Sequence, residues 1–550
     1  MCASEYKKLR NKYVSNIKKF KKESWQEFVN IKGNKDPWGI VNKIVDEKIG
    51  IPTPWTASKL SDGTKTTNLD STIEELLNKF VPVHDTTKLS EECQVLWQGV
   101  REYKNMNLEL LISLSEIKTA ISKFKNKKAP GMDNFKIEIV KELWKKKHEV
   151  IYGLMNNCFS QGLFPRQWKE ANLIILLEGE TRDRTLLISY RPIALLSVVG
   201  KVYERIIVDR IQVIYKNAGL ESPDQFRFRR GKSPDDALKR LRRAIKFNEQ
   251  KYVLTIFVDI QGAFDNLWWA AILSKLVNAN CSTYILNVIK SYFKNRKAIV
   301  QNKMKKYVKK VEKLCPQVSI IGLAAWVLCM DILLNELREN FPSECAAFIV
   351  YADDLACVVK GNTTMELHIH DEKIMAILTK WCNLHKLKIS DSKTVAMLFK
   401  GNLVEKRLAV IKVNGKNIKF VDKTKYLGII VDKKLSFLDH SKYLRSKIMQ
   451  HVSMFKRIAA EHWGIKRHVV NVLYGAVGLP IVKYGAMLWY EVMVKRCILA
   501  FQRAMLLIIT KACRTTSTSA MQVIAGAEPL DLDIIEDVLV RRVKGNLNTT

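Results

Sequence analysis

Two adjacent aspartates, Asp353 and Asp354, lie between two apolar runs and restrict the folds open to this chain more than any other feature. The runs, 346–350 and 355–359, predict two strands joined by a tight hairpin turn. Carboxylates at the tip of buried strands repel each other and are costly to desolvate. A divalent cation removes both penalties, because Mg²⁺ prefers carboxylate and phosphate oxygens. The turn therefore predicts a metal site, although by itself it fits a purely structural role equally well.

A third acid makes the metal site the better interpretation. Asp259 ends an apolar run at 253–258, which predicts another strand about ninety positions before the turn. If these strands are neighbours in one sheet, three carboxylates meet at one end of it. Nucleotidyl transfer needs such a set, because two metal ions about 3.5–4 Å apart activate the attacking hydroxyl and hold the leaving group.

The charge of the chain indicates its partner. It has 91 Lys and Arg against 55 Asp and Glu, a formal net charge of +36, and nucleic acid is the polyanion that most often neutralises such a surface. No membrane partner is expected, because the longest apolar run, 318–330, is too short to cross a bilayer. Eleven cysteines without a Cys-x-x-Cys pair indicate reduced thiols in an intracellular compartment.

Composition divides the chain into four stretches. Residues 1–112 are basic and helix-rich, 113–400 mix strands and helices, 401–434 hold short strands, and 435–550 are basic helices rich in Trp and Tyr. This order predicts an α+β fold followed by an all-helical part.

Local patterns predict further elements inside these stretches. Strands are expected at 171–177, 396–399, 409–413 and 426–431. A helix is expected to open at Gly262 and to continue through 273.

Several segments resemble the sequence motifs of reverse transcriptases, in the order that the family has them. Motifs A, B and C correspond to Phe257-Val-Asp259-Ile-Gln-Gly-Ala-Phe264-Asp265, to Cys315-Pro316-Gln317 with Ser319-Ile-Ile-Gly322, and to Tyr351-Ala-Asp353-Asp354. Motifs D and E correspond to Lys386-Leu-Lys-Ile-Ser with Lys393-Thr394, and to Tyr426-Leu-Gly-Ile429. Segments that resemble the non-LTR (LINE-type) group, and its arthropod elements in particular, are Gly162-Leu-Phe-Pro165-Arg-Gln-Trp168-Lys, Tyr190-Arg-Pro-Ile-Ala-Leu-Leu196, Gly200-Lys-Val-Tyr-Glu-Arg205, Tyr484-Gly-Ala-Met-Leu-Trp489 and Arg514-Thr-Thr-Ser517.

The resemblance implies a right-hand polymerase of the α+β class. Fingers and a ferredoxin-like palm, built from an antiparallel sheet and helices, would span 113–400. The motif E strands would occupy 401–434, and a helical thumb 435–550. Residues 1–112 would be a basic helical extension. The sequence shows no counterpart of the family's upstream endonuclease or downstream zinc knuckle, so a chain truncated of its endonuclease is expected.

The resemblance also implies a catalytic centre. Asp259, Asp353 and Asp354 would hold two Mg²⁺ ions, with Mn²⁺ as the alternative. Lys393 would protonate the departing pyrophosphate. A solvated surface lysine is the competing interpretation for that position.

Three further positions would bind the nucleotide. Arg191 would clamp the triphosphate, because a planar guanidinium suits phosphate oxygens. Phe264 would exclude the ribose 2′-hydroxyl, unless it packs in the core instead, and Gln317 would contact the nucleotide near the templating base. The primer grip would consist of Tyr426, Leu427 and Gly428.

The chain departs from the family pattern at three positions that face substrate. Val318 and Arg227 stand where glycine is usual, and Glu178 stands where a lysine usually ends the fingers strand. A β-branched side chain crowds a position that glycine leaves open, and an acid repels an anionic substrate. These changes favour reduced or lost activity.

The implied function is that of an RNA-directed DNA polymerase of a non-LTR retrotransposon. It would extend a DNA 3′-end on an RNA template, with an RNA template, a DNA primer or target and dNTPs as its partners. The nucleus is the implied location, with a cytoplasmic ribonucleoprotein stage. Two alternatives stay open: a catalytically impaired remnant that only binds RNA or DNA, and a group II intron-type maturase.

Overall fold

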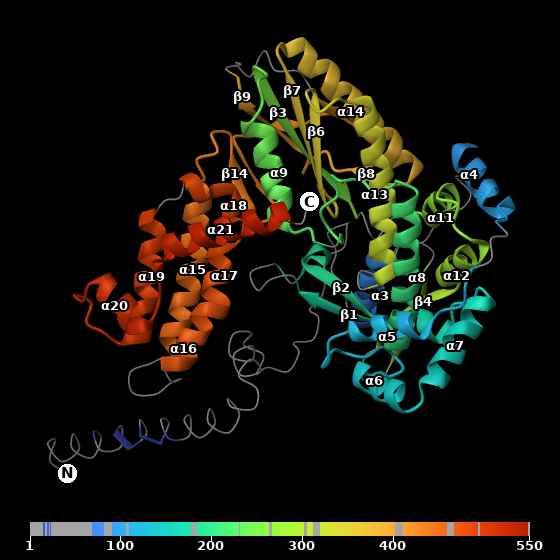
Figure 1. Cartoon of the computed structure of the whole chain (residues 1–550), viewed down its shortest axis with the longest axis horizontal. Helices are drawn as coiled ribbons and strands as arrows, with labels where there is room; N and C mark the ends of the chain where they lie inside the picture. The colour runs from blue at the N-terminus through green and yellow to red at the C-terminus, as the bar shows by residue number, and fades with distance from the viewer. Residues whose placement is uncertain are drawn as a thin grey trace. The chain divides into compact units, whose positions relative to one another are not determined.

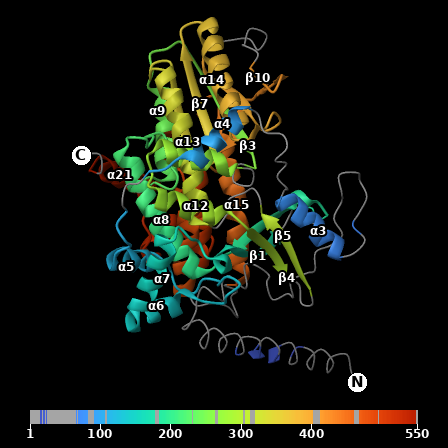
Figure 2. The same cartoon turned by 90° about the vertical axis from the view of Figure 1, so that its right-hand side faces the viewer.

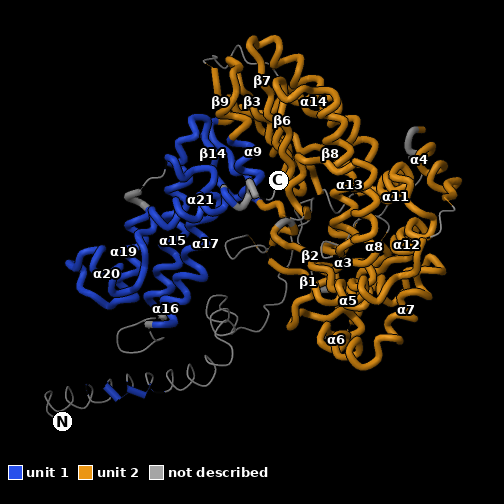
Figure 3. Tube along the Cα trace, in the orientation of Figure 1, with its two compact units in different colours: residues 1–54, 234–242, 422–550 blue, residues 55–233, 243–421 orange. Residues whose placement is uncertain are grey.

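The computed structural model of the chain describes residues 69–81, 91–105, 109–177, 185–229, 231–262, 267–301, 305–311, 319–401, 411–458, 467–492 and 495–547, with residue 183 and a few isolated positions before 69. The chain forms two compact units (Figure 3). Unit 1 comprises 1–54, 234–242 and 422–550, and unit 2 comprises 55–233 and 243–421.

The central sheet of unit 2 has the strand order β12-β9-β3-β7-β6, and β8 pairs with the end of β3 (Figure 1). All neighbouring strands are antiparallel except β12 and β9. The strands predicted at 253–258, 346–350, 355–359 and 396–399 are confirmed, and so is the α+β class. The bounds are Tyr252–Gln261 (β3), Ala346–Tyr351 (β6), Asp354–Gly361 (β7), Lys388–Ile389 (β8), Val395–Lys400 (β9) and Lys419–Phe420 (β12).

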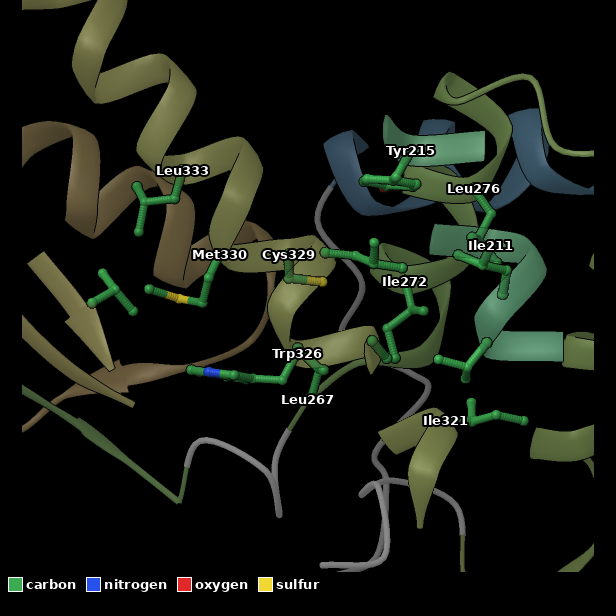
Figure 4. Close-up of a cluster of buried hydrophobic side chains, with 14 of the residues drawn as sticks. Ile211, Tyr215, Leu267, Ile272, Leu276, Ile321, Trp326, Cys329, Met330 and Leu333 are labelled. Carbon is green, nitrogen blue, oxygen red and sulfur yellow. The ribbon is translucent and has the colours of Figure 1, made fainter. Parts of the chain in front are cut away.

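Three helices pack together into the core of unit 2 (Figure 4). They are α8 (Val198–Asn217), α11 (Trp269–Asn278) and α13 (Ile320–Asn340). Trp326 of α13 is 0% exposed, and its side chain points away from the labelled side chains of α8 and α11, toward the strands of the sheet. Burying each large apolar side chain of this kind contributes about 1.5–3 kcal/mol, so the cluster holds the sheet and its helices as one body.

The apolar character of α13 is explained by its position in the core. The helix is long and apolar enough to cross a membrane, yet 67% of its most apolar window is buried inside the protein. On the same unit, α14 (Thr364–Leu384) packs against β7, β8 and α13.

The helix predicted to run from Gly262 through residue 273 is not continuous in the described part of the chain. Leu267 and Trp268 precede α11 as non-helical residues, and Trp268 has extended dihedrals of φ −80° and ψ 126°. The prediction is wrong at these two residues, because the extended backbone before α11 lets both side chains reach the core, where they are 0% and 6% exposed. The residues 263–266 lie outside the described part of the chain.

A second sheet of unit 2 has the order β2-β1-β4-β5. Its side chains alternate, so that one face packs on helix α3 (Leu69–Phe80) in a separate hydrophobic cluster, and α3 lies beside β5 (Figure 2). The other face carries exposed Ile174, Leu176 and Val308. The strand predicted at 171–177 is confirmed. The bounds are Glu170–Leu177 (β1), Tyr190–Leu195 (β2), Arg296–Gln301 (β4) and Lys306–Val311 (β5).

Further helices complete unit 2 around these two sheets. The helix α8 can approach the turn before β1 because Gly200 has no side chain: a Cβ there would lie 2.8 Å from the Trp168 Cβ. A short hairpin of β10 and β11 precedes β12. The bounds are Glu91–Glu102 (α4), Leu114–Ser122 (α5), Ile137–Lys146 (α6), His148–Ser160 (α7), Thr283–Phe293 (α12), Lys412–Val413 (β10) and Lys416–Asn417 (β11).

Unit 1 combines one hairpin with a group of helices. The strand predicted at 426–431 is instead the hairpin of β13 (Lys423–Tyr426) and β14 (Ile429–Asp432), because Leu427 and Gly428 both have positive φ and turn the chain. Of the strand predicted at 409–413, the described part is strand only at 412–413. The helices are Leu438–Ile458 (α15), Arg467–Leu473 (α16), Leu479–Lys483 (α17), Ala486–Trp489 (α18), Lys495–Thr510 (α19), Thr518–Ala525 (α20) and Leu530–Leu547 (α21); helix α9 (Pro234–Lys246) adds its residues 234–242.

Candidate active site

Three aspartates lie at one end of the central sheet. Asp259, near the end of β3, is the register partner of Asp354, the first residue of β7. Asp353 occupies the two-residue turn between β6 and β7. Adjacent strands are about 4.8 Å apart. The pairing therefore brings the carboxylates of Asp259 and Asp354 together, although the two residues are 95 positions apart in the sequence.

The turn that carries Asp353 is held in an unusual backbone conformation. Ala352 has φ +64°, a value that side-chain-bearing residues adopt at a cost of roughly 1–2 kcal/mol. The carbonyl oxygen of Ala352 accepts a hydrogen bond of 2.8 Å from the indole Nε1 of Trp326, on the buried helix α13. The core of unit 2 therefore holds the turn in the conformation that presents both aspartates.

The segment before β9 is fastened to Asp259. The Asp259 backbone N–H donates to the Thr394 hydroxyl at 3.2 Å, and the Asp259 carbonyl accepts from the Ser390 N–H at 2.8 Å. These bonds place Lys393 at the site, with its Nζ 3.7 Å from Asp259 Oδ2. The Lys393 side chain is 69% exposed, so solvent reaches its ammonium group.

Burial and like charge act together on Asp354. Asp354 is an exposed residue, but the packed atoms around it partly desolvate its carboxylate, and this desolvation is the first cause that raises the pKa of Asp354 to about 6. The carboxylates of Asp353 and Asp259 raise it further, whereas the Arg227 guanidinium opposes them. The site therefore has unbalanced negative charge that a cation would stabilise.

The three carboxylates are ligands that suit a hard divalent ion, but their oxygens do not converge on one common position. Among the residues that the structure describes, no group of three or more His, Cys, Asp or Glu side chains is close enough to hold an ion as it stands. Like charges separate when no cation neutralises them. Carboxylate oxygens, completed by substrate phosphates, are nevertheless the ligands that Mg²⁺ takes in such sites.

The other predicted positions are placed only in part. Arg191 lies exposed on β2, opposite Leu176 of β1 and on the same face of the second sheet as Ile174. Phe264 and Gln317 lie outside the described residues, as do the two departures Val318 and Glu178.

The third departure, Arg227, is well described. Its guanidinium carbon lies 5.1 Å from the ring centre of Tyr351 and 4.9 Å from that of Phe228. Tyr351 is the last residue of β6 and closes the turn opposite Asp354. Sequence reasoning treated Arg227 as an obstacle, whereas the structure places it against the catalytic turn.

Glu204 is a residue whose role sequence reasoning missed. It is 1% exposed on α8, and its Oε2 accepts hydrogen bonds from Ser319 Oγ at 2.8 Å, from Ile320 N at 2.7 Å and from Ile321 N at 3.3 Å. The carboxylate thus caps the N-terminus of α13, which begins three residues after Gln317 in the sequence. The available signal was an acid among the apolar positions of a helix.

The predicted primer-grip residues form the hairpin turn of unit 1. Tyr426 and Ile429 are its closing pair, and Leu427 and Gly428 are its tip. The Tyr484 hydroxyl donates to the Leu427 carbonyl at 2.8 Å. This bond joins two sequence segments that resemble the same family.

Comparisons with known proteins agree with this geometry. The family described as reverse transcriptase (RNA-dependent DNA polymerase) matches residues 181–431. A retrovirus-related Pol polyprotein from type-1 retrotransposable element R1 of Bradysia coprophila is 32% identical over 542 residues, which are 97% of this chain and 51% of that protein. The polyprotein of the same name from Nasonia vitripennis is 33% identical over 235 residues, 41% of this chain and 68% of that protein.

A third relative is more distant. The RNA-directed DNA polymerase from mobile element jockey of Drosophila melanogaster is 26% identical over 443 residues, 79% of this chain and 48% of that protein. The chain spans about half the length of the curated relatives that it matches over most of its own length.

Proposed function

Because the chain belongs to the reverse transcriptase family, among the proteins of non-LTR retrotransposons, we propose that it is an RNA-directed DNA polymerase that extends a DNA 3′-end on an RNA template. The observation that carries the proposal is the register pairing of Asp259 with Asp354, with Asp353 in the adjoining turn. Three carboxylates at one sheet end are what two-metal nucleotidyl transfer requires.

Asp259, Asp353 and Asp354 would hold two Mg²⁺ ions, or Mn²⁺ in their place. Such ions, when bound, supply a deprotonated 3′-hydroxyl and neutralise the triphosphate. The protein's own contribution is to fix the carboxylates: Trp326 holds the turn, and Thr394 and Ser390 hold the backbone of Asp259.

The reaction forms a bond between the primer 3′-oxygen and the α-phosphorus, and breaks the bond between the α-phosphorus and the bridging oxygen to the β-phosphate. The proton of the 3′-hydroxyl leaves to solvent, and the pyrophosphate oxygen gains one. Lys393 is the proposed donor of that proton, because its exposed ammonium group lies beside Asp259. Arg191 would bind the triphosphate from the open face of the second sheet.

Other assignments rest on the family alone. Phe264 would exclude ribonucleotides, Gln317 would contact the incoming nucleotide, and the hairpin turn of Tyr426, Leu427 and Gly428 would grip the primer. An RNA template, a DNA primer or target and dNTPs are the proposed partners, which the net charge of +36 supports. The proposed location is the nucleus, with a cytoplasmic ribonucleoprotein stage.

Primer extension tests the proposal. The protein is given an oligo(dT) primer on poly(rA), dTTP and Mg²⁺ or Mn²⁺, beside the double variant Asp353→Ala, Asp354→Ala. We expect extension by the natural sequence, and a loss of at least a thousand-fold in the variant, since removing metal ligands removes most of the rate enhancement. Equal signals from both proteins, with retained RNA binding, would leave only a nucleic-acid-binding role.

A further inference from the structure

The loop that carries Arg227 is fixed to the edge of the catalytic sheet. The Phe226 N–H donates to the Val350 carbonyl at 2.9 Å, and the Val350 N–H donates to the Asp224 carbonyl at 3.0 Å. The bridge between Gln225 and Val350 is parallel, so the loop acts as an added piece of strand beside β6.

Two ion pairs and a hydrogen bond also hold this loop. Arg229 pairs with Asp331, which is 0% exposed on α13, and with Glu221 at 2.7 Å. The Lys232 ammonium donates to the Gln225 carbonyl at 3.0 Å. These contacts hold the backbone on both sides of Arg227, so that its side chain is presented from a fixed loop.

Arg227 is an exposed residue. It rests on Tyr351 and Phe228 by cation–π contact, which orients the guanidinium without using its N–H groups. Within the described ranges, the ion pairs nearby engage Arg229, Arg338 and Lys393 rather than Arg227, whose guanidinium interacts with the Asp354 carboxylate only electrostatically. An oriented guanidinium with available donors suits a phosphate.

The order of the strands indicates which phosphate. At this end of the sheet, Lys393 lies beside Asp259 of β3, and Asp354 of β7 follows on the next strand. Tyr351 of β6 comes last, and the Arg227 guanidinium lies over its ring. In an in-line displacement the attacking and leaving oxygens lie on opposite sides of the phosphorus. If Lys393 serves the leaving pyrophosphate, Arg227 lies on the side of the attacking strand.

We propose that Arg227 binds a backbone phosphate of the primer strand just behind its 3′-end, at a position where the family normally has glycine. The β6 strand is two strand spacings, about 10 Å, from β3. At about 3.4 Å of helix axis for each phosphate of a strand, this distance corresponds to the first three linkages behind the 3′-end. The inference rests on the proposed polymerase function, because it takes the direction of the primer from the role of Lys393.

Equilibrium binding of a labelled RNA–DNA hybrid, without metal ions, tests the contact apart from chemistry. We expect Arg227→Ala to weaken affinity roughly ten-fold and to reduce the slope of log K against log salt by about one. Arg227→Lys should keep the slope and lose part of the affinity, because an ammonium cannot make the paired bonds of a guanidinium. Lys380→Ala, which removes an exposed cation from α14, should change neither quantity.

Neutral linkages identify the strand. A methylphosphonate is placed at each of the first three primer linkages in turn, and at the three facing template linkages. At one primer linkage, the methylphosphonate should weaken binding by the natural sequence roughly ten-fold. The same methylphosphonate should not change binding by Arg227→Ala, because that variant has already lost the contact. Equal losses in both proteins at every linkage, or a loss confined to the template, would overturn the proposal.

The two proposals fail in different ways. A protein that binds the hybrid but does not extend it refutes the polymerase, and the methylphosphonate result then decides on Arg227 alone. A protein that does not bind the hybrid refutes both. If Arg227→Ala binds as well as the natural sequence and extends at a lower Mg²⁺ concentration, Arg227 opposes metal binding instead, and the primer contact is wrong. Because Arg227 is exposed and its cation–π contacts contribute only about 1 kcal/mol, each variant should melt within a few degrees of the natural sequence.

Discussion

Removing the Glu204 carboxylate should destabilise unit 2 strongly, because this buried group satisfies three donors at once. In Glu204→Ala, the hydroxyl of Ser319 and the backbone N–H groups of Ile320 and Ile321 lose their common acceptor. Each hydrogen bond to a charged partner contributes about 1.5–3 kcal/mol, and each buried donor left without a partner costs about 1–3 kcal/mol. The Ser319 hydroxyl can turn to Tyr292, whose oxygen is 2.6 Å away, so the loss should be about 3–5 kcal/mol rather than the full sum.

Urea unfolding followed by tryptophan fluorescence measures this loss, because Trp326 lies buried in the same helix. Glu204→Gln keeps one accepting oxygen without the charge and should lose about 1–2 kcal/mol. Glu339→Ala removes an exposed acid from the far end of α13 and should stay within about 0.5 kcal/mol of the natural sequence. A loss below about 1 kcal/mol in Glu204→Ala, a third of the lowest expected value, would refute the capping argument.

Other expectations concern the turn of unit 1, a buried histidine and salt. Leu427→Asn should stabilise unit 1 by about 1 kcal/mol, measured by thermal unfolding, because Asn-Gly relieves the cost of a leucine at φ +45°; a lower melting temperature would contradict this. His385 is 0% exposed, and burial first and Lys275 second lower its pKa to about 3. Below about pH 6.5, His385 therefore binds a proton in the unfolded chain but not in the folded one. As the pH falls from 6.5 to 3, the free energy of unfolding should decrease by up to about 1.4 kcal/mol for each pH unit. His385→Gln should remove this contribution, so equal pH slopes for both proteins would refute it. Affinity for RNA should drop steeply between low and physiological salt, and a flat response would show that the net charge of +36 does not bind the RNA phosphates.

The residues of the catalytic turn show how far local sequence goes. An apolar run that ends in an acid predicts a strand end, because continuous burial on both faces of a central sheet requires apolar side chains on both. Asp259, Asp353 and Asp354 could be identified in this way. Trp168 and Gly200 belong to two segments that resemble the family, and the structure shows that these two residues pack closely against each other. The hairpin of β13 and β14 was missed, since positive φ at Leu427 is imposed by the strand pairing and is unusual for leucine.

The amino-acid sequence by itself determined the family, the central strands and the identity of the three acids, because these depend on residue type and on order along the chain. Only the tertiary structure decided which strand pairs with which, that Glu204 caps α13 across the core, and that Arg227 rests on Tyr351. These contacts join positions that are 95 residues apart for Asp259 and Asp354, 116 for Glu204 and Ile320, and 124 for Arg227 and Tyr351. No local periodicity encodes them, because their free energy exists only when the packed core has brought the partners together.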